Sequence, residues 1–195
     1  MQFFKTIRKP REGWFRYYRN FGGRGWYGPL RYRLLPEPSV ESVEVAAVRD
    51  ATSQFFWAVE QFFSNIKAGI QSAVNDYRED GKWLAGVRVE ILDMKVHDVD
   101  THAEGMRNEG YLFVVEAIDC LADPIIPVSP EALSSTVVAL SQGIAADAAF
   151  DRLPILADAL QDSGCDDPLV LDHLRTCRDH TPSCWVVEMI LNATR

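Results

Sequence analysis

The chain has 195 residues, 47% of them apolar and 25% charged, which suffices for one hydrophobic core plus an appendage or for two small domains. This composition excludes a fibrous repeat and extensive disorder, and no apolar run approaches the roughly 20 residues that cross a bilayer. The start, MQFFKTIRKPREG, lacks the apolar core of a secretory signal, so we expect a cytoplasmic protein. Four cysteines are too few for a disulfide scaffold, and reduced thiols are expected.

The net charge of −8 is distributed unevenly along the chain. Residues 1–35 contain nine Lys or Arg and one acid, a charge of +8, so residues 36–195 carry −16. A basic amino-terminal segment on an acidic body points to a polyanionic partner at one end of the molecule.

Aromatic residues are interleaved with the basic ones in residues 3–32. Cations neutralise phosphates and flat rings stack on bases, so this mixture suits contact with single-stranded RNA. An edge strand with inward aromatic and outward arginine side chains explains it equally well. The arginines that would support RNA binding are Arg16, Arg19, Arg31 and Arg33.

A glycine-rich stretch, Gly22-Gly23-Arg24-Gly25-Trp26-Tyr27-Gly28, lies within the basic segment. Four glycines in seven positions permit a tight loop between two paired strands. The stretch is not a phosphate-binding P-loop, because no Gly-Lys-Ser/Thr closes it.

The next elements follow from hydrophobic periodicity. We expect a strand over residues 31–34, a second over 40–48, and an amphipathic helix over 55–75 that ends at 77–81. A strand beginning at Lys82 continues with alternating apolar residues, namely Val87, Val89 and Ile91.

A short acidic turn, His97-Asp98-Val99-Asp100, joins this strand to another amphipathic helix. Thr101 and Glu104 have the spacing of a capping box, which predicts a helix start here. A turn held between two buried elements is a good place to present a side chain to a partner. On the residues alone, however, a histidine beside two acids is more often a solvated turn residue.

After prolines at 124, 127 and 130, the pattern becomes helical over residues 131–160, so we place a boundary between domains 1–128 and 129–195. The second part contains several thiol and imidazole ligands, which suggest a zinc site: Cys165, Cys177, His180 and Cys184, with His173 between them. Buried structural cysteines explain the same residues, and we favour that interpretation, with no metal or other cofactor. A Cys-His nucleophile pair lacks a nameable orienting group, so no enzyme active site is predicted.

The two turns carry a resemblance to a known family. The glycine-rich loop, the helix containing Gly69-Ile70-Gln71, the strand Val87-Arg88-Val89, and the turn His97-Asp98-Val99-Asp100 are similar, in the same order, to the fourth domain of bacterial elongation factor G. This resemblance covers residues 3–128. Residues 150–187 resemble a short helical tail found at the carboxyl ends of many unrelated bacterial proteins, with no activity known to us.

The resemblance implies an α/β fold, a small mixed sheet with helices on one face, like the second domain of a ribosomal protein of the small subunit. It also implies a two-loop RNA-binding tip: His97, Asp98 and Asp100 in one loop, and Gly23, Arg24, Gly25 and Trp26 in the other. Trp26 stands where the family commonly has Gln, so it offers stacking in place of the amide's hydrogen bonds.

We therefore predict a non-catalytic module, like part of a translation factor, that binds the ribosome or another structured RNA. No Walker-type loop is present, so we expect no nucleotide binding and no GTPase domain in this chain. The alternative is a degenerate domain that binds a protein partner through its helical tail.

Overall fold

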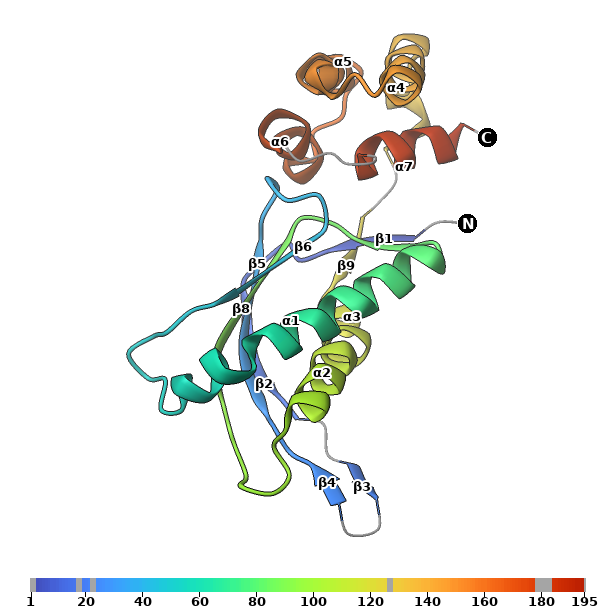
Figure 1. Ribbon diagram of the computed structural model, residues 1–195. Helices are drawn as coiled ribbons and strands as arrows, with labels where there is room; N and C mark the ends of the chain where they lie inside the picture. Colours follow the sequence, from blue (N-terminus) through green and yellow to red (C-terminus); the bar gives the residue numbers. More distant parts are fainter. Residues whose placement is uncertain (1–2, 17–18, 22–23, 126–127, 178–183, 195) are drawn as a thin grey trace.

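The computed structural model describes residues 3–16, 19–21, 24–125, 128–177 and 184–194. Figure 1 shows a sheet with helices on one face, a group of helices at one end, and two loops at the opposite end. None of the helices in these ranges has the length and apolarity needed to cross a membrane.

The central sheet has four strands in the order β2-β5-β8-β6. They are β2 (Arg11–Phe15), β5 (Leu30–Pro36), β8 (Val87–Met94) and β6 (Val43–Ala47). The pairs β2–β5 and β5–β8 are antiparallel, whereas β6 and β8 are parallel. This is the mixed sheet that the sequence predicted.

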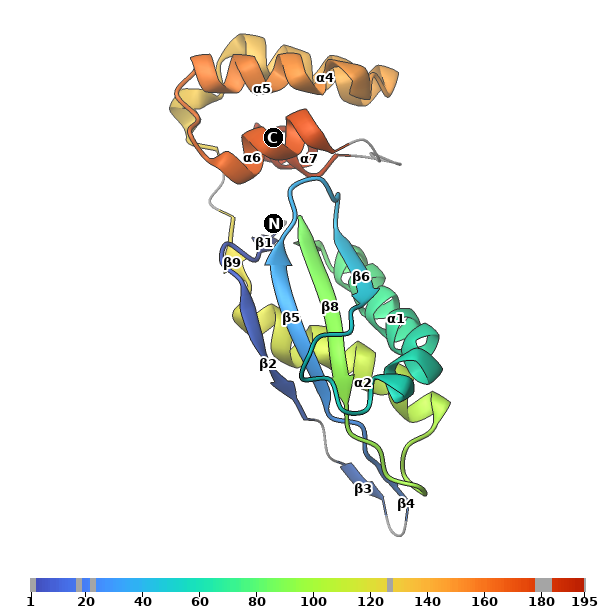
Figure 2. The ribbon, with the colours of Figure 1, turned by 90° about the vertical axis from the view of Figure 1, so that its left-hand side faces the viewer.

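Two long helices cover one face of this sheet, as Figures 1 and 2 show. They are α1 (Phe56–Glu79) and α2 (Ala103–Leu112), and the second continues through a π-helical turn, η1 (Phe113–Ile118), into α3 (Asp119–Leu121). Ile66 and Ile70 of α1 and Phe113 of η1 are buried in one cluster with Val89 and Ile91 of β8. The predicted α/β class with helices on one face is confirmed.

The strand predicted to run on from Lys82 is instead two strands, so that prediction is wrong. Strand β7 (Lys82–Leu84) belongs to a second sheet, in which β1 (Phe3–Thr6) lies between β7 and β9 (Asp123–Pro124). Gly86 has φ of +60°, a left-handed conformation that breaks the strand before β8 begins. Alternation within each piece concealed this turn.

The carboxyl-terminal part is helical, as predicted. It consists of η2 (Pro130–Ala132), α4 (Ser135–Asp147), η3 (Phe150–Arg152), α5 (Leu153–Asp162), α6 (Pro168–Thr176) and α7 (Trp185–Ala193). Its own buried cluster includes Leu156, Leu160 and Trp185, together with Phe4 and Ala85 from the sheet side. The domain boundary at 128/129 stays a prediction.

Helices α1 and α2 approach each other closely through two glycines. A Cβ atom on Gly69 would lie 1.9 Å from the carbonyl oxygen of Arg107, and one on Gly110 would lie 2.3 Å from that of Ile66. Both obstacles are backbone atoms, so a side chain at either position forces the two helices apart.

Gly69→Ala should therefore lower the free energy of unfolding by about 1–3 kcal/mol, the usual cost of overpacking a core. Urea denaturation monitored by circular dichroism measures it. Gly143→Ala is the matched control, because nothing lies within 4 Å of a Cβ at this α4 position. That variant should be stabilised by about 0.5–1 kcal/mol. Equal stability changes in the two variants would contradict the close packing of α1 and α2.

Candidate functional site

The glycine-rich stretch and the histidine turn lie side by side at the end of the molecule opposite the helical tail (Figure 1). The first forms a hairpin of β3 (Arg19–Phe21) and β4 (Arg24–Trp26), and the second joins β8 to α2. Two backbone hydrogen bonds link them: Tyr27 N–H donates to Asp100 O at 3.2 Å, and Lys95 N–H donates to Pro29 O at 2.9 Å. We call the described residues 24–29 and 95–102 the tip.

Thr101 joins the two turns through its side chain. Its hydroxyl accepts a hydrogen bond from His97 N–H at 2.8 Å and donates one to Tyr27 O at 2.7 Å. The predicted capping box at Thr101 is therefore wrong, because the N-cap of α2 is His102, whose Nδ1 accepts from Gly105 N–H at 3.1 Å. The threonine hydroxyl is used between the turns instead of by the helix.

His97 is presented to solvent but held from behind. Its side chain is 56% exposed, its Nδ1 lies 3.1 Å from Asp100 Oδ2, and its ring meets that of Tyr27 edge-on at 6.2 Å. Asp98 is exposed beside it. An exposed imidazole in a fixed turn is able to donate or accept hydrogen bonds and to stack on a flat partner.

The hairpin residues of the predicted site are placed less completely. Arg24, Gly25 and Trp26 form β4, where Trp26 pairs with Arg19 of β3, and the Trp26 side chain is partly buried. Gly23 lies outside the described residues. Arg19 and Arg24 are placed by their backbone pairing alone.

Arg31 and Arg33, predicted as basic support, are already matched by carboxylates. Arg31 pairs with Glu12 at 2.6 Å and Asp50 at 3.2 Å, while Arg33 pairs with Glu12 at 3.1 Å and Glu90 at 3.0 Å. These pairs join neighbouring strands, and they reduce the positive potential that the two arginines offer to a polyanion.

Asp50 has further partners in this network. Hydrogen bonds from the Thr52 hydroxyl and backbone N–H, with Arg31 nearby, lower the pKa of Asp50 to about 2. It therefore stays ionised opposite Arg31 at any physiological pH.

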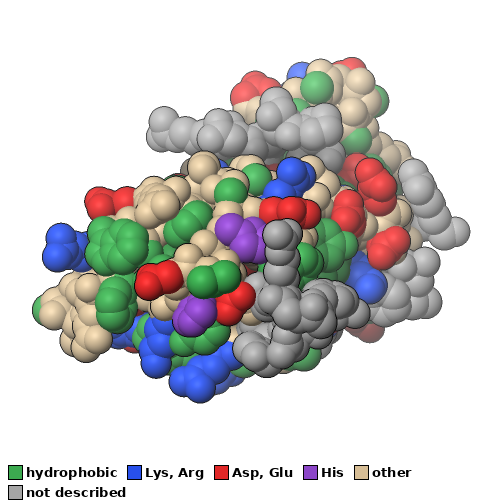
Figure 3. Space-filling model, turned by 60° about the horizontal axis from the view of Figure 1, so that its bottom comes forward, with side chains coloured by type: hydrophobic (Ala, Val, Ile, Leu, Met, Phe, Trp, Pro, Cys, Tyr) green, Lys and Arg blue, Asp and Glu red, His purple; other side chains and the backbone are tan. Residues whose placement is uncertain are grey.

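Two residues near the tip were not singled out from the sequence. Lys95 and Trp14 are both exposed, and Lys95 Nζ lies 5.4 Å from the centre of the Trp14 ring. Arg16, which was predicted, is exposed just before the hairpin. In Figure 3, which brings this end forward, basic side chains gather beside one of the histidines, with acidic side chains among them. Lys95 directly precedes the histidine turn, but only the pairing of strands places it over Trp14.

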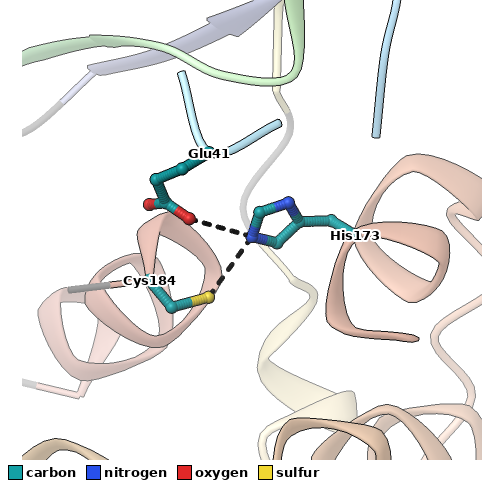
Figure 4. Close-up of side chains that lie close together, drawn as sticks. All are labelled: Glu41, His173 and Cys184. Carbon is teal, nitrogen blue, oxygen red and sulfur yellow. Dashed lines mark hydrogen bonds and ion pairs between the residues drawn. The ribbon is translucent and has the colours of Figure 1, made fainter. Parts of the chain in front are cut away.

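A second cluster of polar side chains lies between the sheet and the helical tail. His173 Nε2 is 3.1 Å from Glu41 Oε2 and 3.4 Å from Cys184 Sγ, while His173 Nδ1 is 2.9 Å from Pro38 O (Figure 4). Burial lowers the pKa of His173, but hydrogen bonds and charge interactions with Cys184 and Glu41 outweigh it and raise that pKa to about 9.

This cluster is not the ligand set that the sequence suggested. Among the described residues, the ligand atoms that converge belong to Glu41, His173 and Cys184. Cys177 is buried and Cys165 is partly exposed, both outside this group, and His180 is not among the described residues. Glu41 was missed because it comes from a distant loop with no ligand-like spacing.

The comparisons with known proteins fit this part of the chain. Elongation factor G of Petrotoga mobilis is 25% identical over 142 residues, which cover 69% of this chain and 20% of that protein. Elongation factor G of Thermotoga petrophila is 31% identical over 97 residues, covering 50% of this chain and 14% of the relative. The chain thus spans a fifth or less of the length of these relatives, and a region of it is related to a part of elongation factor G.

No family model matches the chain. A Thermus thermophilus protein of known crystal structure is 22% identical, with a TM-score of 0.44, and the likeness covers 56% of this chain and 16% of that one.

Thr101→Val should loosen the tip, since both hydrogen bonds of the hydroxyl are lost. Hydrogen exchange of the His97 amide should become roughly tenfold faster, because a hydrogen bond contributes about 1 kcal/mol. Mass spectrometry or NMR measures this rate. Thr176→Val is the control, because its hydroxyl donates to Asp172 O within α6. An unchanged exchange rate at His97 would refute the joining role of Thr101.

Proposed function

We propose that residues 1–128 form a domain like the fourth domain of elongation factor G and bind the ribosome, or another structured RNA, through the tip. The observation that carries the proposal is the joining of the two turns by Thr101 and by the Tyr27–Asp100 hydrogen bond. The similarity to segments of elongation factor G supports it.

The side chains at the tip suit an RNA partner. His97 is exposed, Trp26 is partly exposed, and Trp14 with Lys95 adds an aromatic ring and a cation beside them. Rings of this kind stack on unpaired bases, and the cation meets phosphate. Since Arg31 and Arg33 are paired with carboxylates, stacking and hydrogen bonding at the tip carry more of the contact than a broad basic surface does.

In this proposal the chain acts by binding and not by catalysis. It works in the cytoplasm and uses no nucleotide, so any GTP hydrolysis that drives its action comes from another protein. Asp98 and Asp100 shape the turn, and Asp100 takes part through both its carboxylate and its backbone carbonyl.

The double variant Trp26→Ala/His97→Ala tests the proposal. Each lost stacking contact costs about 1–3 kcal/mol, so ribosome affinity should fall at least about tenfold. Co-sedimentation with ribosomes in a low-salt gradient measures the affinity. Trp57→Ala is the control, because Trp57 is a 54% exposed aromatic on α1 and lies outside the tip. Ribosome binding that is equal for the wild type and the double variant would rule the proposal out.

Capture from lysate with the full chain, with and without ribonuclease, separates this function from the alternative. Loss of the captured material after ribonuclease supports RNA binding by the tip. A protein partner that survives ribonuclease and is captured equally by the double variant supports an interaction through the helical tail.

A further inference from the structure

Glu41, His173 and Cys184 come from three separate segments of the chain. Glu41 lies in the loop between β5 and β6, His173 in α6, and Cys184 at the N-cap of α7. Their ligand atoms all lie within 4.8 Å of one another, and the three side chains are almost completely buried, at 10%, 0% and 1% exposure. This cluster is at the opposite end of the molecule from the tip.

We propose that these three side chains bind a Zn²⁺ ion that fastens the helical tail to the sheet. A carboxylate, an imidazole and a thiolate form a donor set that zinc accepts, whereas Mg²⁺ and Ca²⁺ prefer oxygen ligands alone. The proposal does not depend on RNA binding.

The distances fit tetrahedral coordination. With zinc bonds of about 2.0–2.3 Å, two ligands of a tetrahedron lie about 3.4 Å apart for nitrogen and oxygen and about 3.6 Å apart for nitrogen and sulfur. The structure has 3.1 Å between His173 Nε2 and Glu41 Oε2, and 3.4 Å between Nε2 and Cys184 Sγ. An outward shift of a few tenths of an ångström accommodates the ion.

Neighbouring groups orient two of the ligands. The carbonyl of Pro38 only accepts hydrogen bonds, so His173 Nδ1 carries a proton, and a neutral ring then presents the Nε2 lone pair to the centre of the cluster. Glu41 Oε1 accepts a hydrogen bond from Trp185 N–H at 2.6 Å, which turns the other carboxylate oxygen toward His173. Such outer hydrogen bonds are typical of histidine and carboxylate ligands of metals.

The same geometry argues against a cysteine nucleophile. In a Cys-His-carboxylate relay, the thiol and the orienting group contact opposite nitrogens of the imidazole. Here Glu41 and Cys184 both face Nε2, and Nδ1 faces a backbone carbonyl (Figure 4). Two ligands that converge on one ring nitrogen surround the position that a metal ion takes.

Three ligands leave one coordination position, which a water molecule fills in an open zinc site. The surroundings favour tight binding, because the His173 ring packs 5.0 Å from the ring of the fully buried Trp185. Charge interactions are stronger in such a dry environment than in water.

Zinc analysis of the full-length chain tests the proposal. After incubation with Zn²⁺ and gel filtration, the wild type should retain about one zinc ion per chain, and zinc should raise its melting temperature. Cys184→Ser and Glu41→Gln should each bind zinc at least about a hundredfold more weakly. Cys165→Ser is the matched control and should retain zinc, because Cys165 is a tail cysteine outside the cluster.

Cobalt substitution provides a readout of the ligand itself. Co²⁺ bound to the wild type should give the absorption band of a cobalt–thiolate bond, and Glu41→Gln should weaken Co²⁺ binding while the fold is kept, which circular dichroism verifies. If Cys184→Ser fails to fold, Glu41→Gln carries the test. Less than about a tenth of a zinc ion per wild-type chain, or wild-type zinc affinity in Glu41→Gln, would overturn the proposal.

Discussion

The pairing of β5 with β8 is the constraint on which the candidate site depends. In this antiparallel pair, Leu30 lies opposite Met94 and Pro36 opposite Val87. The segment before β5 and the segment after β8 must therefore emerge at the same end of the sheet. Tyr27 and His97 meet there because the register leaves them only a few residues beyond the last pair. The hydrogen bonds of Thr101 then fix what the register has brought together.

Local patterns in the sequence predicted most of the elements but not how they meet. The apolar spacing of α1 and the alternation in β8 were sufficient to identify a helix and a strand, and both have the predicted character. The turn at Gly86 was missed because alternation continues on both sides of it. The roles of Thr101 and Glu41 depend on partners distant in the sequence, which periodicity does not reveal.

The tail and the sheet share more than one kind of contact. Phe4 stacks on Trp83 at 5.8 Å and reaches Trp185 at 6.3 Å, and Arg8 pairs with Asp167 at 2.9 Å. Together with the Glu41–His173–Cys184 cluster, these contacts combine apolar burial with buried polar groups. Several residues of the basic amino-terminal segment therefore serve the structure: Arg8 holds the tail, while Arg31 and Arg33 join strands of the sheet.

Strand β1 depends on two partners that come much later in the chain. It pairs in parallel with β7 and antiparallel with β9, and Lys5 also bonds the carboxylate of Asp119 at 2.8 Å. During synthesis the first strand must therefore wait, unpaired on that side, until the segment that forms β9 has been made. A nascent chain that stops before Asp123 has an open edge on β1, and with it a route to aggregation that the finished molecule closes.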